Sequence, residues 1–515
     1  MIVALEPSLE QGIGSVLDTA VAERFASRLF AKDPTLWGQA AQNEASIRLG
    51  WVDDPQAQRA LVGEISDLRE ALLGDGASRV ILCGMGGSSL GPEVMCASAG
   101  VPLVVIDTTH ADVLAPVLGS DLSDVVVVVS SKSGGTVETD SARRIFEKAL
   151  MDQGLSPTRH IVVVTDPGSP LHQESVASGY RVFLANPSVG GRYSALTAFG
   201  LVPCGLAGMD LVSLLDEAHQ AWSTLSMDAP SNPGLRLGAA LANGAPERNK
   251  ILLADAPGMP GFGDWVEQLV AESTGKDGRG LLPVVGSGLR DSDDCLTVGS
   301  VGSAASVKIT GGLGAQILLW EVATVFAAAQ LGVNPFDQPN VESAKIAARE
   351  LLSREARHSA DSDPREAMSV WASFDDGGSP ETLIQALLRL VGTSSYVALC
   401  VFGNSAEQAP WRSVATSLEQ NTNRPVTVGF GPRFLHSTGQ FHKGGPAEGV
   451  FIQIVEVPTA SFEIPGRDFD CTGLLVAQAR GDAQVIAESG QPILSITVRS
   501  DEARRRVLEL LSSTT

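Results

Sequence analysis

The feature that most constrains the fold is Val125–Val129, five consecutive valines that run into a polar turn. Valine is β-branched and the run is too short to cross a membrane, so it predicts a strand buried on both faces of a parallel sheet. A helix is predicted from Val137 to about Met151. The intervening loop, 130–136, joins a strand end to a helix N-terminus, where free backbone N–H groups favour an anion, above all a phosphate.

An ordinary strand–helix loop with an N-cap is the simpler alternative for 130–136. The sequence SSKSGGT, however, combines four hydroxyl side chains, two glycines and a lysine within seven residues. This is more than helix capping requires. We therefore expect the loop to hold an anion.

Strand and helix signals alternate after residue 76, which predicts a doubly wound parallel sheet of the α/β class. Residues 1–76 are predicted to be helical, at 17–30 and 55–73, and to pack outside this first sheet. The turn-rich segment 228–234 predicts a boundary between a first domain, 77–227, and a second α/β domain, 228–515. The strands expected in the first domain are 79–83, 103–107, 125–130, 160–165 and 181–184.

The second domain is also expected to alternate helices and strands. A polar stretch at 358–379 is predicted to be a loop. Helices are expected at 234–244, 265–274, 314–331 and 341–352, and strands at 250–254, 396–402, 425–429, 450–456 and 492–497.

The net charge of −22 over 515 residues argues against a protein that binds nucleic-acid phosphates. An anionic ligand must then be held by a local positive site. The six cysteines form no CxxC pair, which indicates reduced core thiols in a reducing compartment. The chain starts without a basic signal-peptide region, and no apolar run reaches about 18 residues. We therefore expect a cytoplasmic protein without a membrane-spanning helix.

The first predicted strand runs into a glycine-rich turn, GMGGSSLGP at 84–92, that lets a ligand approach backbone N–H groups. No lysine follows in the register of a nucleotide-binding Walker A loop. The turn nearly matches a dinucleotide fingerprint, and Asp107 ends the next strand where a ribose partner would lie. Because Ser89 replaces the third fingerprint glycine, the match is weak. Nicotinamide binding remains an alternative.

Two further motifs carry candidate catalytic groups. In GGRYS at 190–194, Arg192 offers a fixed fork of donors, although a surface turn would have the same sequence. In WVEQLVAESTGKDGRG at 265–280, Gln268 and Glu272 lie four apart on one helix face. Glu272 falls at a helix end that disfavours negative charge, which makes it a candidate base. The alternative is a solvated face that exposes Glu267 and Glu272.

The remaining candidates lie later in the chain. In NPFDQPNVESAK, Lys345 falls on the first turns of a helix, which could also be a capped surface helix. The glycine-rich loop 432–446 carries His436 and His442, six residues apart. Neither has a partner at metal-ligand spacing, so zinc is not expected. A histidine in such a loop is a candidate acid or base, and bracing of the loop is the alternative.

Together these motifs resemble the phosphoglucose (glucose-6-phosphate) isomerase family from about Val80 onward. The likeness is carried by GMGGSSLGP, SSKSGGTVET, GGRYS, EQLVAESTGKDGRGLLP, GVNPFDQPNVESAK and LHSTGQ. The last two motifs and the closing region look most like the isomerase part of transaldolase–isomerase fusion proteins. The resemblance implies two sugar isomerase (SIS) domains of the doubly wound type, a homodimer, a sugar-phosphate substrate, and neither metal nor cofactor.

The resemblance also implies roles for individual residues. Glu272 would move a proton between C2 and C1, Arg192 would steady the enediol intermediate, and His436 would assist ring opening with Lys345 near the same oxygen. The residues implied to bind the substrate are Gly87, Ser88, Ser131, Lys132, Ser133, Thr136 and Gln268. In most of the family the histidine motif lies between the glutamate and the lysine. Here it follows both, so the role of His436 is less secure than that of Glu272.

Three functions follow as hypotheses. The first is reversible isomerisation of glucose 6-phosphate and fructose 6-phosphate. The second is a non-catalytic SIS-type sensor that keeps only the phosphate loop. The third is a nicotinamide-dependent dehydrogenase.

Overall fold

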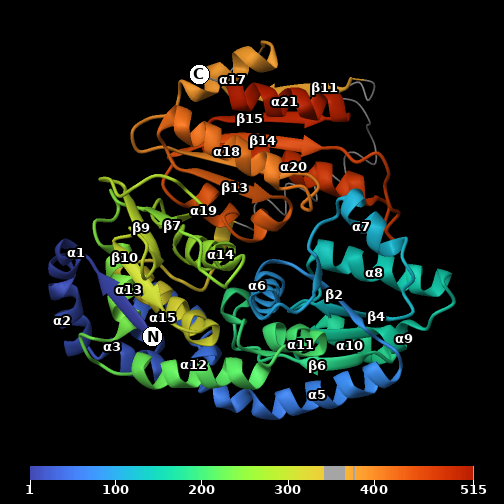
Figure 1. Cartoon of the computed structure of the whole chain (residues 1–515), viewed down its shortest axis with the longest axis horizontal. Helices are drawn as coiled ribbons and strands as arrows, with labels where there is room; N and C mark the ends of the chain where they lie inside the picture. The colour runs from blue at the N-terminus through green and yellow to red at the C-terminus, as the bar shows by residue number, and fades with distance from the viewer. Residues whose placement is uncertain (341–365, 375–376, 514–515) are drawn as a thin grey trace.

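The computed structural model describes residues 1–340, 366–374 and 377–513. In that part of the chain, three five-stranded sheets carry the fold. Figure 1 shows the third sheet at the top, the first at the lower right and the second at the lower left, beside the N-terminus. The predicted α/β class with parallel sheets is confirmed.

The first sheet is parallel throughout and has the order β3-β2-β4-β5-β6. Its central strand is the valine run, and all six of its residues are buried, as the sequence predicts. Each fully buried valine contributes about 1.5–3 kcal/mol of hydrophobic free energy. The strands are β2 (Arg79–Gly84), β3 (Val104–Ile106), β4 (Val125–Ser130), β5 (Ile161–Thr165) and β6 (Arg181–Leu184). Its helices are α6 (Leu90–Ala99), α7 (Ala111–Leu118), α8 (Val137–Asp152), α9 (Pro157–His160), α10 (Pro170–Ser178) and α11 (Ala198–Ala207).

The second sheet has the order β1-β10-β9-β7-β8, with β1 antiparallel and the others parallel. Its strands are β1 (Ile2–Leu5), β7 (Lys250–Leu253), β8 (Leu282–Val285), β9 (Cys295–Ser300) and β10 (Val307–Thr310). The helices are α12 (Leu211–Leu225), α13 (Pro233–Ala242), α14 (Phe262–Thr274) and α15 (Leu313–Leu331). Among the described helices, α15 alone is long and apolar enough to cross a membrane, but 89% of that window is buried inside the protein. It is the central helix of the core.

The third sheet has the order β11-β15-β14-β12-β13, with β11 antiparallel and the others parallel. Its strands are β11 (Met368–Ala372), β12 (Tyr396–Phe402), β13 (Val426–Phe430), β14 (Gly449–Glu456) and β15 (Ile493–Val498). The helices are α17 (Pro380–Leu388), α18 (Ala409–Thr422), α19 (Gly439–Gly444), α20 (Cys471–Glu488) and α21 (Asp501–Ser513). One buried cluster joins residues of this sheet to Leu252, Leu282 and Val284 of the second sheet.

The N-terminal segment differs from its prediction. Its helices are α1 (Pro7–Gly12), α2 (Gly14–Ala22), α3 (Phe25–Phe30), α4 (Gln39–Ala45) and α5 (Arg59–Gly74). Of these, α5 packs on α11 of the first sheet, as expected. However, β1 adds to the second sheet, and Trp37 Nε1 donates to the Val325 carbonyl of α15 at 2.8 Å. The segment therefore contacts both units, because short apolar stretches such as Ile2–Leu5 complete an open sheet edge.

One further expectation needs correction. The stretch 358–379, predicted to be a loop, contains β11, whose residues are only partly buried at a sheet edge and so lack a strong apolar signal. The described part of the region 228–515, predicted to be a second SIS domain with a C-terminal region, holds strands of two separate sheets, and its domain bounds stay a prediction. The predicted helix 341–352 lies outside the described residues. All six cysteines are buried and unbonded, as predicted.

Candidate active site

Glycines let three sequence motifs meet at the carboxyl end of the first sheet. Gly86 has φ +56°, and a Cβ there would lie 2.7 Å from Gln268 Nε2. A Cβ on Gly87 would lie 2.0 Å from the carbonyl oxygen of Gly191. No side chain fits at either position. The 84–92 turn therefore packs directly on the GGRYS turn and on α14.

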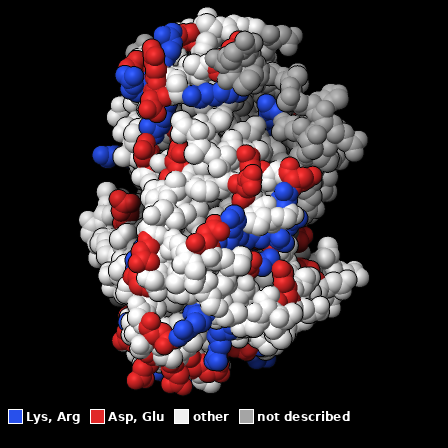
Figure 2. Space-filling view, turned by 90° about the vertical axis from the view of Figure 1, so that its right-hand side faces the viewer, with Lys and Arg blue, Asp and Glu red and all other residues white. Residues whose placement is uncertain are grey.

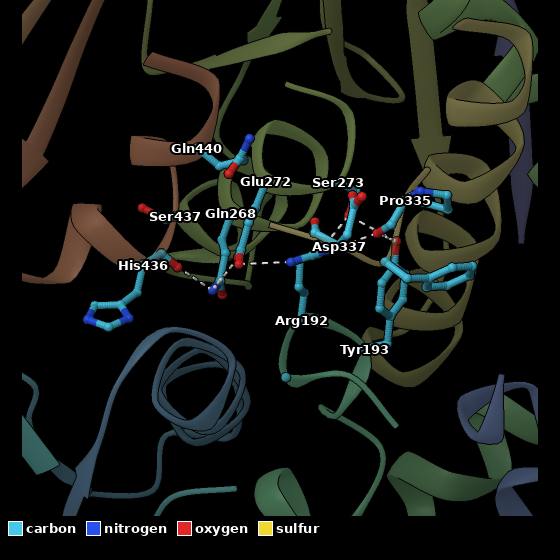
Figure 3. Close-up of polar contacts among 12 residues, drawn as sticks. Arg192, Tyr193, Gln268, Glu272, Ser273, Pro335, Asp337, His436, Ser437 and Gln440 are labelled. Atoms are coloured by element: carbon cyan, nitrogen blue, oxygen red, sulfur yellow. Dashed lines mark hydrogen bonds and ion pairs between the residues drawn. The ribbon is translucent and has the colours of Figure 1, made fainter. Parts of the chain in front are cut away.

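Glu272 and Arg192 form a buried ion pair at this meeting point. Arg192 Nη1 lies 2.8 Å from Glu272 Oε1, and the two side chains are 3% and 5% exposed. Figure 3 shows Arg192 reaching up from the GGRYS turn towards the end of α14. Both side chains are buried, so the alternatives of a surface turn and a solvated helix face do not apply to them. The guanidinium places a positive charge beside Glu272 at the C-terminal end of α14, where the helix dipole disfavours a negative charge.

Arg192 is fixed by a second set of bonds on its other side. Its Nε donates to Ser273 Oγ at 3.0 Å, and its Nη2 donates to the Pro335 carbonyl at 2.8 Å. With its amide oriented to satisfy both partners, Gln338 donates to Glu272 Oε1 at 2.9 Å and accepts from Arg192 Nη1 at 2.7 Å. The segment around NPFDQP thus closes over the ion pair. The sequence argument quoted this motif without selecting Gln338.

Gln268 links Glu272 to the third sheet's unit. Its Nε2 donates to Glu272 Oε2 at 3.1 Å and to the His436 carbonyl at 2.7 Å. Its Oε1 is buried without a hydrogen-bond partner among the described residues. The side chain predicted to lie beside Glu272 therefore does so, and it keeps one acceptor for a ligand.

His436 points its imidazole away from Arg192, as Figure 3 shows. Its Nε2 lies 3.0 Å from Glu138 Oε1, and the Gln478 amide donates to the same oxygen at 2.6 Å. Burial raises the pKa of Glu138, but the charge and hydrogen bond of His436 outweigh it, and the net effect is a lowered pKa. Glu138 belongs to the quoted motif SSKSGGTVET, yet sequence reasoning missed it, because its partner lies 298 positions away.

His442, in contrast to His436, is buried in the protein core. Its Nδ1 lies 2.9 Å from the Tyr396 hydroxyl, and its ring stacks on that of Tyr396. Burial, reinforced by the charge of Lys443, lowers its pKa to about 3. His442 is therefore a neutral core residue near neutral pH.

Gln440 of the same loop connects the unit of the third sheet to that of the second sheet, because its Nε2 donates to the Gly275 carbonyl at 2.9 Å.

The phosphate loop carries hydroxyls that are only partly used. Ser131 Oγ accepts from Gly134 N at 3.2 Å, and Ser133 Oγ accepts from Gly135 N at 3.1 Å. Thr136 is the N-cap residue of α8, and its side chain makes no capping hydrogen bond. Among the described residues, neither serine hydroxyl donates within this loop. Both remain available to an anion at the start of α8.

Lys132 forms its contacts within the protein. Its Nζ pairs with Asp166 at 2.8 Å and donates to the carbonyls of Pro187 and Val189 at 3.1 and 2.9 Å. The ammonium group thus fastens the GGRYS loop to the phosphate loop. The predicted direct contact with substrate stays a prediction.

A cavity of about 270 Å³ lies beside Arg192 and Gln338. Its wall includes Lys132, Asp337, and two residues of the N-terminal segment, Glu44 and Arg48. Sequence reasoning found no usable motif in that segment, and nothing in the sequence near Arg48 marks it as part of a site. The cavity wall is completed by Gly190, Gly191, Tyr193 and Phe336.

Two other charged groups are structural. Asp107, the possible ribose partner, is buried and ion-paired with Arg433, so it is not open to a nucleotide. Lys276 is buried against Asp337 at 2.7 Å, and burial, with the charge of Arg192, lowers its pKa to about 8. Lys345 lies outside the described residues. No group of three potential metal ligands occurs among the residues that the structure describes.

The surface seen in Figure 2 mixes acidic and basic side chains rather than presenting a field of one sign. With a net charge of −22, long-range attraction of an anion is weak. A phosphorylated ligand must therefore be held by close contacts.

The fold places the chain in a known class. The glucose-6-phosphate isomerase of Chlamydia trachomatis superimposes with a TM-score of 0.50 at 20% identity, covering 65% of this chain and 79% of that one. This class consists of α/β proteins built from parallel sheets. In this chain, the candidate site lies where loops of separate sheets converge.

Sequence comparison finds one family that is similar to part of the chain. Residues 69–242 match the family model described as phosphoglucose isomerase. A probable glucose-6-phosphate isomerase of Haloarcula marismortui is 33% identical over 254 residues, 48% of this chain and 56% of the relative. A glucose-6-phosphate isomerase of Thermus thermophilus is 36% identical over 208 residues, 39% of this chain and 49% of the relative.

The chain is thus similar in sequence to the phosphoglucose isomerase family, which confirms the resemblance to that family inferred from its motifs. The closer likeness to transaldolase–isomerase fusion proteins stays a prediction. The match spans about half the length of these curated relatives.

Proposed function

We propose that this protein is a glucose-6-phosphate isomerase. It opens the sugar ring, moves a proton between C2 and C1 through a cis-enediol, and closes the product ring. This aldose–ketose exchange needs a base, an acid or base at the ring oxygen and a cation for the enediolate. It works without a cofactor or metal, on a sugar phosphate in a cytoplasmic homodimer. The proposed domains are 77–227 and 228–515, preceded by 1–76.

The observation that carries the proposal is the buried set formed by Glu272, Arg192, Gln268 and Gln338. Three separate donors converge on one carboxylate: Arg192 at 2.8 Å, Gln338 at 2.9 Å and Gln268 at 3.1 Å. Such donors hold the carboxylate of a base in a fixed position. A carboxylate positioned in this way is suited to abstracting a proton next to a carbonyl, worth roughly 10²–10⁴-fold in rate.

Arg192 and Gln338 are also proposed to stabilise the enediolate intermediate. When Glu272 takes the proton, it loses its negative charge, while the substrate gains one at the enediolate oxygen. The guanidinium, held in place by Ser273 and the Pro335 carbonyl, then faces the new charge without having to move. Fixed donors stabilise a transition state because they are already oriented when the charge develops.

His436 is proposed to assist ring opening. Glu138 accepts from its Nε2, so the imidazole is held in one orientation by a buried carboxylate. His436 is 16% exposed, whereas Glu138 is 4% exposed, so the imidazole is the accessible member of the pair. The neutral, buried character of His442 supports the choice of His436.

Ser131, Ser133 and Thr136 are proposed to bind the phosphate, with Gly87 and Ser88 near the sugar. Backbone N–H groups at the start of α8 and unused serine protons provide the donors. Phosphate binding far from C1 and C2 keeps these carbons in register with Glu272. Lys345 is proposed to act near the ring oxygen.

The test is turnover of fructose 6-phosphate in a coupled assay, with neither metal nor nucleotide added to the isomerase. We expect production of glucose 6-phosphate by the wild-type chain and its loss in Glu272→Gln. Binding of fructose 6-phosphate without turnover would instead identify a sugar-phosphate sensor. Activity that depends on added nicotinamide nucleotide in the isomerase step would indicate a dehydrogenase.

A further inference from the structure

A second cavity, of about 310 Å³, lies at the carboxyl ends of the second sheet's parallel strands. Leu253 ends β7, Ser300 ends β9 and Thr310 ends β10, and all three residues line the cavity. The first turns of α14 and α15 complete the wall through Phe262 and Gln316. The chain passes from β7 to β8 on one side and then to β9 on the other. Such a switch in strand order is where open parallel sheets bind ligands.

The wall of this cavity contains no ionisable side chain. Its members are mainly apolar. The groups among them that can form hydrogen bonds are the side chains of Ser300, Thr310 and Gln316 and the indole Nε1 of Trp320, which has no partner among the described residues. The cavity beside Arg192 is the opposite, since Glu44, Arg48, Lys132 and Asp337 all line it. Moving a charged group into an apolar wall without a partner costs several kcal/mol. A sugar phosphate is therefore an unsuitable occupant of the second cavity, and a neutral molecule is a suitable one.

The wall offers a fixed polar contact at Gln316. Gln316 donates through Nε2 to the Gly311 carbonyl at 3.0 Å, which fixes its amide group. Among the described residues, its amide forms hydrogen bonds only through Nε2, so Oε1 keeps its accepting capacity. A volume of about 310 Å³ is at the lower end of the range for small-molecule pockets. The fitting ligand is small, flat or compact, and carries one N–H or O–H donor.

We propose that this cavity is a second binding site, separate from the candidate active site, for a neutral and mainly apolar molecule of one or two fused rings with a single hydrogen-bond donor. The ring packs against Phe262, Met259 and Trp320, and the donor reaches Gln316 Oε1. The proposal does not depend on the function proposed for the other site, because the two cavities share no lining residue.

The third sheet provides a comparison within the same chain. Its strand order switches in the same way, between β12 and β14. There, however, Glu456 lies over the strand ends and accepts from Asn404 N at 3.0 Å, Trp411 Nε1 at 3.1 Å and Arg504 Nε at 2.6 Å. The protein's own side chain occupies that position. In the second sheet no residue of the described chain fills the corresponding space, which remains a cavity.

Indole is the probe for the test, since it is neutral, bicyclic and has one N–H donor. Binding to the full chain is measured by saturation-transfer NMR and titration. Ala254 lines the cavity and is exposed, so Ala254→Trp fills the space without disturbing the core. The matched control is Ala406→Trp, an exposed position beyond the end of β12. Circular dichroism verifies that both variants are folded.

We expect indole to bind the wild-type chain and Ala406→Trp equally, and to bind Ala254→Trp at least tenfold more weakly. Gln316→Leu is expected to weaken indole several-fold, and to weaken 1-methylindole, which lacks the donor, much less. Indole-3-carboxylate is expected to bind at least tenfold more weakly than indole. No binding of indole at millimolar concentration, or equal binding by Ala254→Trp, would overturn the proposal.

Discussion

The four parallel strands of the third sheet, β13-β12-β14-β15, follow the same order as β3-β2-β4-β5 of the first sheet. However, different groups lie at the carboxyl ends of these strands. In the first, β4 ends in a serine- and glycine-rich loop whose backbone and hydroxyl donors are open to an anion. In the third, β14 ends in Glu456, which is ion-paired with Arg504 and accepts a hydrogen bond from Trp411. The comparison teaches that the parallel-sheet fold supplies a site geometry, whereas the loop residues decide whether a ligand or a side chain fills it.

The largest expected effect is on kcat, and it distinguishes Glu272 of the candidate active site from Glu456 of the third sheet. Glu272→Gln keeps the shape of the proposed base but cannot accept a proton, so we expect kcat for fructose 6-phosphate to fall by roughly 10²–10⁴-fold. Steady-state kinetics is the measurement. Glu456→Gln is the control and should leave kcat within about twofold. An equal fall in both variants would mean that the loss comes from the fold.

Arg192→Ala should lower kcat by about 10²-fold and raise KM much less, because the fixed cation acts where negative charge develops. The change also leaves Glu272 without its ion-pair partner, at a cost of about 3–5 kcal/mol in stability. Arg143→Ala is the matched control. Arg143 is 4% exposed and ion-paired with Asp140 and Glu147, so it tests the cost of breaking a buried pair elsewhere. A rise in KM alone for Arg192→Ala would assign this residue to phosphate binding.

The two histidines of the 432–446 loop allow a proposed catalytic group, His436, to be compared with a structural one, His442. His436→Ala should reduce turnover of cyclic fructose 6-phosphate about tenfold or more, and largely spare proton exchange on an open-chain analogue. His442→Ala should do neither beyond its effect on folding. The measurement is the ratio of the two rates in each variant. Equal losses on both substrates in His436→Ala would place this residue in proton transfer or in the structure.

Ser133→Ala should weaken phosphate binding by about tenfold, because a hydrogen bond to a charged group is worth roughly 1.5–3 kcal/mol. KM for fructose 6-phosphate should rise while kcat changes little. Ser413→Ala, on the surface of α18, is the control. A crystal grown in sulfate should show the ion at Ser131, Ser133 and Thr136. An empty loop with saturating ligand bound elsewhere would contradict the assignment.

The smallest effect concerns His442 and acid stability. Its pKa in the folded chain is about 3, against an ordinary value of 6.5. The unfolded chain therefore binds a proton that the folded chain does not, and stability falls as the pH drops from about 6.5 towards 3. The slope from this residue is about 1.4 kcal/mol per pH unit. His442→Phe should reduce that slope in urea unfolding experiments. An unchanged slope would show that His442 is not buried as a neutral group.

The valine run and the alternating pattern predicted the first sheet well, because buried parallel strands have a strong local signal. β4 and β6 have the predicted bounds, and α14 and α15 begin within a few residues of their predicted starts. Strands β8, β9 and β10 were not predicted. β8 and β10 have four residues each, and β8 contains Pro283, which hides the strand signal. β9 has six residues, but three of them are only partly buried, so its apolar signal is weak.

The site was predictable to the extent that its residues lie in compact motifs. Glu272, Gln268 and Arg192 were selected correctly as neighbours, since glycines and a helix face bring them together. Glu138 was missed because its role arises from contact with His436 in a distant unit. Arg48 was missed because only tertiary packing brings the N-terminal segment to the cavity.

The central claim is that Glu272 moves a proton through an enediol that exchanges with solvent. The direct measurement is proton NMR of glucose 6-phosphate and fructose 6-phosphate incubated with the enzyme in D₂O. The account predicts that deuterium enters at C2 of glucose 6-phosphate during turnover by the wild-type chain, and that Glu272→Gln binds the sugar phosphate without exchange. Turnover without any deuterium at C2, or full exchange by Glu272→Gln, would contradict it.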